Sequence, residues 1–341
     1  MLMATVVDDS VVAYDKREQY DDFLTFLRSK LPITECPLEV ICGMKVVKAP
    51  DGSISIDQSE YIEKKAKAFN CLGGGRRVFS PMDQRFELTE FRPTVPDTKL
   101  VSYARELMGS LIYATLTRPD CKYACSKLAS VVTNPTSDEI SAMERVLKYM
   151  YATRNTALTF RPGPWTGPDG TVHEPLEMAV YVDASFAPSE GRKSQTGFAI
   201  LLAGAAILAK SGKQTQVTDS TGYSEAIALH ECANWVIVVR NQLKLMFSEK
   251  TRPAVFERPT RIHEDNSAAV TFAQKGPGPR SLHWDVKLQY VRELQTVFKV
   301  IEVVPIATDL QIADVLTKAL GIDQHLRLSE LLMGGPIVFT G

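Results

Sequence analysis

The 341-residue sequence lacks long hydrophobic runs, an excess of charge of either sign and an ordered cysteine pattern. Its longest apolar run, Phe198 to Ala209, has twelve residues, fewer than the roughly 18 that a membrane-spanning helix needs. The net charge of −1 gives no global signature of polyanion binding, so any nucleic-acid contact must come from a local patch. Cys121 and Cys125 have no second pair to complete a zinc site, and we interpret all six cysteines as reduced core thiols. We therefore expect an intracellular protein, in cytoplasm or nucleus, that has no membrane partner.

What is present is a globular composition, with 45% hydrophobic and 23% charged residues over a length that suggests two domains. One segment differs from the rest: Arg161 to Pro175 contains four prolines and three glycines. Because these residues interrupt helices and strands, we expect a linker that continues neither. This divides the chain into residues 1–160, a linker at 161–175, a domain at 176–320 and a tail at 321–341.

Hydrophobic periodicity predicts a mixed α and β region before the linker and an ordered α/β domain after it. The first region has helical spacing over Leu100–Thr115 and Glu139–Thr153, and a hairpin pattern around Pro50-Asp51-Gly52. The second is predicted to contain strands at 178–182, 196–202 and 205–209, a long helix at 225–246, a strand at 261–264, helices at 267–274 and 282–295, a strand at 298–304 and a closing helix at 310–320. This order predicts helices packed on a five-stranded mixed sheet.

Four acidic residues lie within or at the end of apolar segments, where a buried carboxylate would be costly without a partner. Asp183 and Asp265 end two apolar strands, Glu225 begins the apolar stripe of the long helix, and Asp314 lies on the closing helix. If the two strands are neighbours, all four acids meet at one end of the sheet. Clustered carboxylates repel unless a cation neutralises them, and oxygen-only ligands favour Mg²⁺, with Mn²⁺ as a second option. Two such ions are the usual apparatus for in-line attack on a phosphodiester.

Each acid also has a purely structural interpretation. Asp265 could be a helix N-cap, and Glu225 a first-turn acid that complements the helix dipole. Asp183 could lie in a turn at the end of its strand, and Asp314 at a solvated helix position. Each of these alternatives is favoured when taken singly, but together they require four coincidences in the right order.

Short motifs surround the four acids. They are, in chain order, Tyr181-Val182-Asp183-Ala184, Arg192-Lys193-Ser194, Thr196-Gly197, Ser220-Thr221, Ile227-Ala228-Leu229, Glu264-Asp265-Asn266-Ser267-Ala268, His283-Trp284-Asp285, Val291-Arg292-Glu293 and Ala313-Asp314 with Thr317-Lys318-Ala319-Leu320. This set resembles the ribonuclease H domain of copia-type LTR retrotransposon polyproteins, over about residues 177–320. The chain departs from the family pattern at Ser185, Tyr223 and Gln289.

The resemblance implies a ribonuclease H-like fold and cleavage of the RNA strand of an RNA–DNA hybrid. It also implies that the metal-binding and catalytic acids are Asp183, Glu225, Asp265 and Asp314, which hold two Mg²⁺ ions without any organic cofactor. The family pattern usually has another acid at Tyr223, a His at Gln289 and an Asp at Ser185. None of these three departures removes an implied metal ligand.

The N-terminal region resembles the downstream end of the same polyprotein's reverse transcriptase, a partial palm and thumb. Val6-Val7-Asp8-Asp9 resembles the palm turn that carries two catalytic aspartates. A polymerase needs a further metal-binding acid from an earlier strand and the fingers that hold the template. The residues before Asp8 and Asp9 supply neither, so we interpret this pair as a remnant. An ordinary turn is the structural alternative.

A basic helix face indicates a local contact with nucleic acid. Arg280, His283 and Lys287 share one side of the 282–295 helix, next to Trp284, although a charged face can also be merely solvated. Arg192, Lys193 and Asn266, from the matching motifs, complete the predicted nucleic-acid-binding set.

The sequence thus predicts a Mg²⁺-dependent endoribonuclease attached to an incomplete reverse transcriptase. The expected partners are an RNA–DNA hybrid and a reverse-transcriptase chain that contains fingers. The alternative is a catalytically inactive remnant that binds nucleic acid or has a structural role.

Overall fold

The computed structural model describes the chain except for residues 7–8, 73–76, 187–192, 219, 277–284 and 341. Several residues singled out from the sequence lie outside the described part: Asp8, Arg192, Arg280, His283 and Trp284. The basic helix face is therefore described only at Lys287. In the described part, no helix is long and apolar enough to cross a membrane.

The N-terminal region combines a small sheet with a helical cluster. A hairpin of β1 (Leu2–Val6) and β2 (Asp9–Ala13) precedes α1 (Arg17–Arg28). The sheet has the order β3 (Val40–Ile41), β4 (Met44–Lys48), β5 (Ile54–Asp57) and β6 (Leu158–Phe160). Antiparallel pairing of β4 and β5 confirms the hairpin predicted around Asp51. The helices share one buried core and are α2 (Ser59–Ala68), α3 (Thr98–Ala114), α4 (Lys122–Ala129) and α5 (Ser137–Ala152).

The C-terminal part contains the five-stranded mixed sheet predicted from the sequence. Its spatial order is β11 (Ala205–Lys213), β10 (Gln195–Leu202), β9 (Ala179–Ser185), β12 (Thr260–Glu264) and β13 (Ile301–Pro305). The first three strands are antiparallel, whereas β12 is parallel to both β9 and β13. This pairing places the ends of β9 and β12 next to each other, as the convergence of acids requires.

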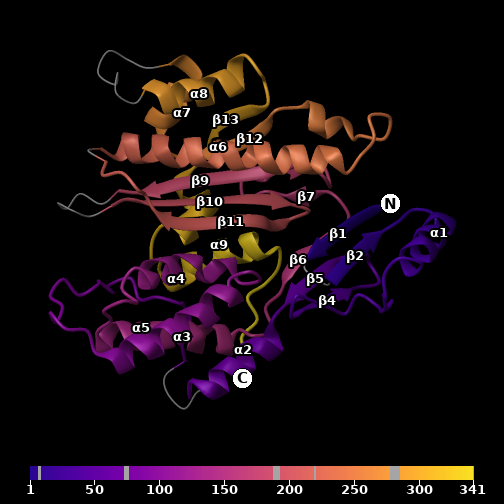
Figure 1. Cartoon of the computed structure of the whole chain (residues 1–341). Coiled ribbons are helices and arrows are strands. Elements are labelled where there is room, and N and C mark those ends of the chain that lie inside the picture. The colour runs from indigo at the N-terminus through magenta and orange to yellow at the C-terminus, as the bar shows by residue number, and fades with distance from the viewer. Residues whose placement is uncertain (7–8, 73–76, 187–192, 219, 277–284, 341) are drawn as a thin grey trace.

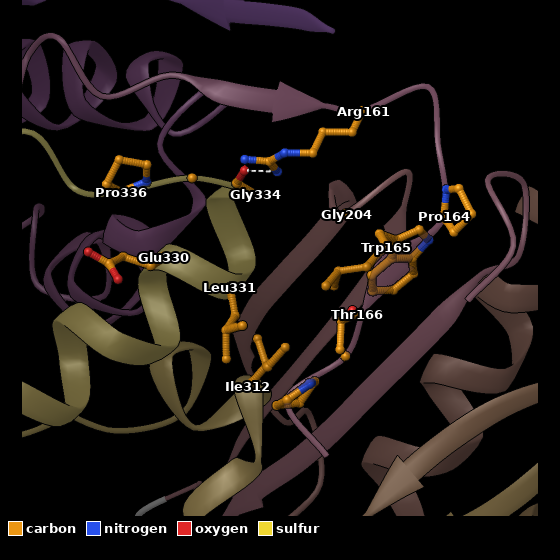
Figure 2. Close-up of a pocket in the computed structure, with 14 residues that line it drawn as sticks. Arg161, Pro164, Trp165, Thr166, Gly204, Ile312, Glu330, Leu331, Gly334 and Pro336 are labelled. Atoms are coloured by element: carbon orange, nitrogen blue, oxygen red, sulfur yellow. Dashed lines mark hydrogen bonds between the residues drawn. The ribbon is translucent and has the colours of Figure 1, made fainter. Parts of the chain in front are cut away.

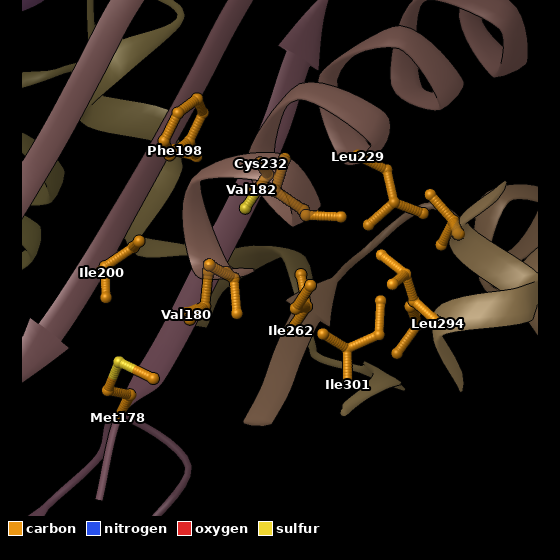
Figure 3. Packing of buried hydrophobic residues seen from close by; sticks show 14 of the residues in the cluster. Met178, Val180, Val182, Phe198, Ile200, Leu229, Cys232, Ile262, Leu294 and Ile301 are labelled. Atoms are coloured by element: carbon orange, nitrogen blue, oxygen red, sulfur yellow. The ribbon is translucent and has the colours of Figure 1, made fainter. Parts of the chain in front are cut away.

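Helices cover both faces of this sheet (Figure 1). On one face α6 (Thr221–Leu245), α7 (Ser267–Lys275) and α8 (Asp285–Thr296) bury a core that includes Val180, Val182 and Ile262, shown in Figure 3. Because strand residues alternate between faces, Tyr181 points to the opposite core, where it packs with Leu316 and Leu328. By the same alternation, Asp183 on β9 lies on the face of Tyr181, opposite to the face of Val182.

Residues 161–175 are not free of regular structure, so that expectation is wrong. They form a short hairpin of β7 (Trp165–Thr166) and β8 (Val172–His173), in which Trp165 and His173 are buried. The prolines and glycines lie outside the two strands, where they do not interrupt the pairing. The domain boundaries drawn at this segment stay a prediction.

The closing helix predicted at 310–320 is also wrong. The chain there forms two short 3₁₀ helices, η4 (Thr308–Leu310) and η5 (Ile312–Leu316). Between them the Gln311 amide donates to the backbone carbonyls of Val182 and His263, which pins the segment to the ends of β9 and β12. A regular helix, α9 (Ile322–Met333), instead occupies the predicted tail and buries Leu328 and Leu332.

Candidate active site

The four acids predicted from the sequence lie at one end of the five-stranded sheet. Asp183 belongs to β9, Glu225 to α6 and Asp314 to η5, and all three are at least 96% buried. Asp265 follows the last residue of β12 and is half-buried. Burial, and after it the charges of neighbouring acids that include Asp183 and Asp265, raise the pKa of both Glu225 and Asp314. The structure thus brings the predicted acids together.

One pair of acids lies on the η5 face of the sheet. The Lys318 ammonium lies 2.8 Å from Asp314 Oδ1 and 3.9 Å from Asp183 Oδ2, and the Thr317 hydroxyl donates to Asp183 Oδ2. Burial raises the pKa of Asp183 even though Lys318 opposes the rise. Burial, followed by the charge of Asp183, raises the pKa of Asp314 to about 7. A single lysine therefore only partly compensates these two carboxyl groups.

A second pair lies on the α6 face, and one of its members was missed by the sequence analysis. Glu264 shares the face of Ile262 on β12 and is fully buried. Burial raises its pKa well above the ordinary value, and burial together with the charge of Glu264 raises the pKa of Glu225 to about 11. One oxygen of each, Oε2, has no hydrogen-bond partner among the described residues. We call Asp183, Glu225, Glu264, Asp265 and Asp314 the acid cluster.

The purely structural interpretations of the four acids do not hold. The N-cap of α7 is Asn266, whose Oδ1 accepts from the backbone of Ala268 and Ala269, so Asp265 is not the cap. Glu225 follows the first turn of α6, which begins at Thr221. Asp183 lies within β9 rather than in a turn, and Asp314 is buried rather than solvated.

Gly197 on β10 brings η5 close to the acids. It pairs with Asp183 across the sheet, and a Cβ at this position would lie 2.5 Å from Thr317 Cγ2 and 2.8 Å from Leu316 Cβ. Contacts that short would displace η5, so glycine allows the approach that places Thr317 against Asp183.

The described members of the nucleic-acid-binding set have diverse surroundings. Lys193 is exposed just before β10. Lys287 on α8 donates to Gln216 Oε1 at 2.9 Å, which places its ammonium near the segment that leads into α6. Asn266 uses its side-chain oxygen to cap α7, adjacent to Asp265.

The remnant polymerase pair is represented by Asp9 alone. It is the first residue of β2, is exposed and pairs with Val6 in a two-stranded hairpin. A polymerase site needs converging acids, and Asp9 belongs to a separate sheet from the acid cluster.

A pocket of about 480 Å³ lies away from the acid cluster. Figure 2 shows Trp165 and Pro164 on one side, and Ile312 and Leu331 on the other. Gly204, in the turn that joins β10 to β11, also lines it. The pocket is therefore separate from the predicted site.

The acid cluster fits a hard divalent cation in its donor chemistry. It offers only carboxylate oxygens. The Oε2 atoms of Glu225 and Glu264, which have no hydrogen-bond partner in the described part of the chain, are buried, where an uncompensated negative charge is costly. Among the described residues, no group of three or more His, Cys, Asp or Glu side chains is arranged to hold a metal ion. The donors are thus suitable, while their present arrangement is not that of a closed metal site.

No protein-family model matches the chain. The chain is 27% identical over 305 residues to the retrovirus-related Pol polyprotein from transposon TNT 1-94 of Nicotiana tabacum, a match that covers 87% of this chain and 21% of that protein. It is 26% identical over 325 residues to the retrovirus-related Pol polyprotein from transposon RE1 of Arabidopsis thaliana, with 93% and 20% covered. The chain spans about a fifth of the length of these relatives.

A comparison with solved structures finds LC11-RNase H1 in complex with an RNA/DNA hybrid. The two chains are 17% identical, and the match covers 41% of this chain and 94% of the other, with a TM-score of 0.30.

Proposed function

Because the chain belongs to the Pol polyproteins of copia-type retrotransposons, we propose that its C-terminal part is a ribonuclease H-type enzyme. It cleaves the RNA strand of RNA–DNA hybrids and depends on Mg²⁺, with Mn²⁺ as a substitute. The observation that carries the proposal is the convergence of four motif acids, from β9, α6, η5 and the end of β12, at one end of a mixed sheet.

In this proposal Asp183, Glu225, Asp265 and Asp314 hold two ions. Bound there, the ions would activate a water and stabilise the leaving oxygen of a phosphodiester. Thr317 donates to Asp183 and so fixes the direction of that carboxylate. Asn266 caps α7 and thereby holds the segment that carries Asp265. The exposed Lys193 and the Lys287 ammonium supply positive charge for the hybrid backbone.

The test is cleavage of a hybrid labelled on its RNA strand, with Mg²⁺ or with EDTA. Asp183→Asn keeps the side-chain shape but removes a charge, so cleavage should fall about 1,000-fold or more. Asp309→Asn is the matched control, because Asp309 is an exposed aspartate on the neighbouring η4. Its rate should equal that of the parent, and circular dichroism should show both variants folded.

Two outcomes would contradict the proposal. One is a parent protein that binds the hybrid without cutting it, which is the behaviour of an inactive remnant. The other is an Asp183→Asn variant that retains the parent rate in a preparation free of host ribonuclease.

The N-terminal region we assign, by the same resemblance, to the end of a reverse transcriptase that works with a chain containing fingers. Asp9 lies exposed in an isolated hairpin, so primer extension by this chain alone should be undetectable. Templated nucleotide incorporation by the purified chain would contradict this assignment.

A further inference from the structure

Lys318 occupies an unusual position for a lysine. Its ammonium contacts Asp314 Oδ1 at 2.8 Å and lies 3.9 Å from Asp183 Oδ2, while its side chain is 39% exposed. The two carboxyl groups are almost completely buried. The lysine thus reaches from the surface into the acid cluster, with a path back to solvent.

The carboxylate oxygens that Lys318 contacts are oxygens that a divalent ion would need. A divalent ion that took these same oxygens would be repelled by the lysine ammonium that lies against them. Lys318 follows Asp314 by four residues, and η5 ends at Leu316 just before it. A change of side-chain rotamer at Lys318 leaves its backbone hydrogen bond to the Asp314 carbonyl in place, so the ammonium can move toward solvent without disturbing η5.

We propose that Lys318 is a tethered cation that competes with divalent metal for Asp183 and Asp314 and leaves the acid cluster when metal binds. The inference rests on the proposed function, because it concerns how the same site is regulated. Lys318 compensates the acids when metal is scarce and sets the metal concentration at which the site assembles.

The first experiment measures Mn²⁺ affinity by calorimetry on the full chain. Lys318→Met removes the competing charge but keeps the length of the side chain, so the Mn²⁺ dissociation constant should fall about tenfold or more. Lys318→Arg keeps the charge and should bind Mn²⁺ like the parent. Lys210→Met is the matched control, because Lys210 is 40% exposed and pairs with Glu231 outside the acid cluster.

The second experiment needs no variant and so does not depend on the folding of Lys318→Met. The parent is acetylated with a lysine-selective reagent with and without Mg²⁺, and modified peptides are quantified by mass spectrometry. Displacement into solvent should raise the acetylation rate of Lys318 about threefold or more on adding Mg²⁺. The rate at Lys210 should stay constant.

These results separate the inference from the proposed function. Tighter Mn²⁺ binding by Lys318→Met together with no hybrid cleavage by the parent would support the inference and contradict the nuclease. Equal or weaker Mn²⁺ binding by a folded Lys318→Met would overturn the inference whatever the cleavage rate. Constant Lys318 acetylation, or no Mn²⁺ binding by parent and variant alike, would also overturn it.

Discussion

Two groups of buried charges in this molecule are built differently. In the N-terminal region, Arg118 and Asp120 form a bidentate ion pair, with Nε–Oδ1 at 2.9 Å and Nη2–Oδ2 at 2.7 Å. Arg118 also donates to the Thr153 carbonyl, and the Tyr149 hydroxyl donates to Asp120. Burial would raise the pKa of Asp120, but the charge and hydrogen bonds of Arg118 outweigh it and lower the pKa.

The acid cluster has the opposite balance. In the part of the chain that the structure describes, Lys318 is the cation that contacts Asp183 and Asp314, and the Oε2 atoms of Glu225 and Glu264 have no hydrogen-bond partner. In the acid cluster, burial raises the pKa of Asp183 and Asp314. At Asp120, by contrast, the effect of burial on the pKa is outweighed by Arg118. Burial of a carboxyl group therefore does not by itself indicate a functional site. The informative difference is whether the surrounding cations and donors match the buried acids.

The largest expected effect comes from removing the cation of the Arg118–Asp120 ion pair, which we call the matched pair. Arg118→Met leaves Asp120 buried without its cation, so the free energy of unfolding should fall by about 3–5 kcal/mol in urea titrations. Arg258→Met removes an exposed pair with Glu174 and should cost about 1 kcal/mol or less. A double variant, Arg118→Met with Asp120→Leu, should recover much of the loss, because neither charge then remains.

A loss below 1 kcal/mol in Arg118→Met would show that the pair is not a matched structural unit. Hybrid cleavage per folded molecule should be unchanged in this variant, since, among the described residues, the hydrogen bonds of Arg118 go to Asp120 and to the Thr153 carbonyl rather than to the acid cluster. A selective loss of cleavage with unchanged stability would remove the distinction between the two groups.

The sequence predicted the acid cluster better than the matched pair. Asp183 and Glu225 could be found because each interrupts an apolar pattern whose period fixes the buried face. Arg118 and Asp120 could not be identified as a buried pair, because Thr153 and Tyr149, which complete their hydrogen bonds, are about 30 residues away. Their burial depends on tertiary packing.

Two other misses have similar causes. Glu264 was hidden because Asp265, its neighbour, carried the motif, although its position on the Ile262 face of β12 was a usable signal. The helix predicted at 310–320 fails because Gln311 bonds to two strand ends that are far away in sequence. The sheet and its main helices were predictable because their patterns are local and long.

The free energy of unfolding should depend on pH through His325, which lies beside the matched pair. His325 Nε2 is 3.2 Å from the Tyr149 hydroxyl, and burial lowers the pKa of His325 from 6.5 to about 4. The folded state keeps this imidazole neutral, while the unfolded state binds a proton below pH 6.5. His325 therefore costs no stability above pH 6.5. As the pH falls from 6.5 toward 4, this group lowers the free energy of unfolding by about 1.4 kcal/mol per pH unit.

The measurement is the free energy of unfolding of the parent and of His325→Gln at several pH values between 7.5 and 4.5, in EDTA. Subtracting the two curves removes the contribution of other titrating groups. The difference should change only below pH 6.5. A difference that is flat across this range would mean that the buried pair tolerates a protonated His325, and that its charges are less closely matched than the hydrogen bonds indicate.

The smallest expected effect is a gain of stability from removing an unmatched acid. The pKa of Glu264 is raised on folding, so at pH 8 the folded state must either take up a proton or bury a charge, and this group costs stability above its unfolded pKa of about 4.5. Glu264→Gln removes that cost and should raise the free energy of unfolding by about 1 kcal/mol at pH 8 in EDTA. The gain should vanish near pH 4, where the parent's carboxyl group is neutral in both states. The control is Glu302→Gln, which removes an exposed ion pair with Arg261 on the neighbouring strand and should show no such gain.

A Glu264→Gln variant that is less stable than the parent at pH 8 would contradict this prediction. Glu264 would then stabilise the fold as a charged group, as Asp120 does, and the contrast between the two groups of buried charges would not hold for Glu264.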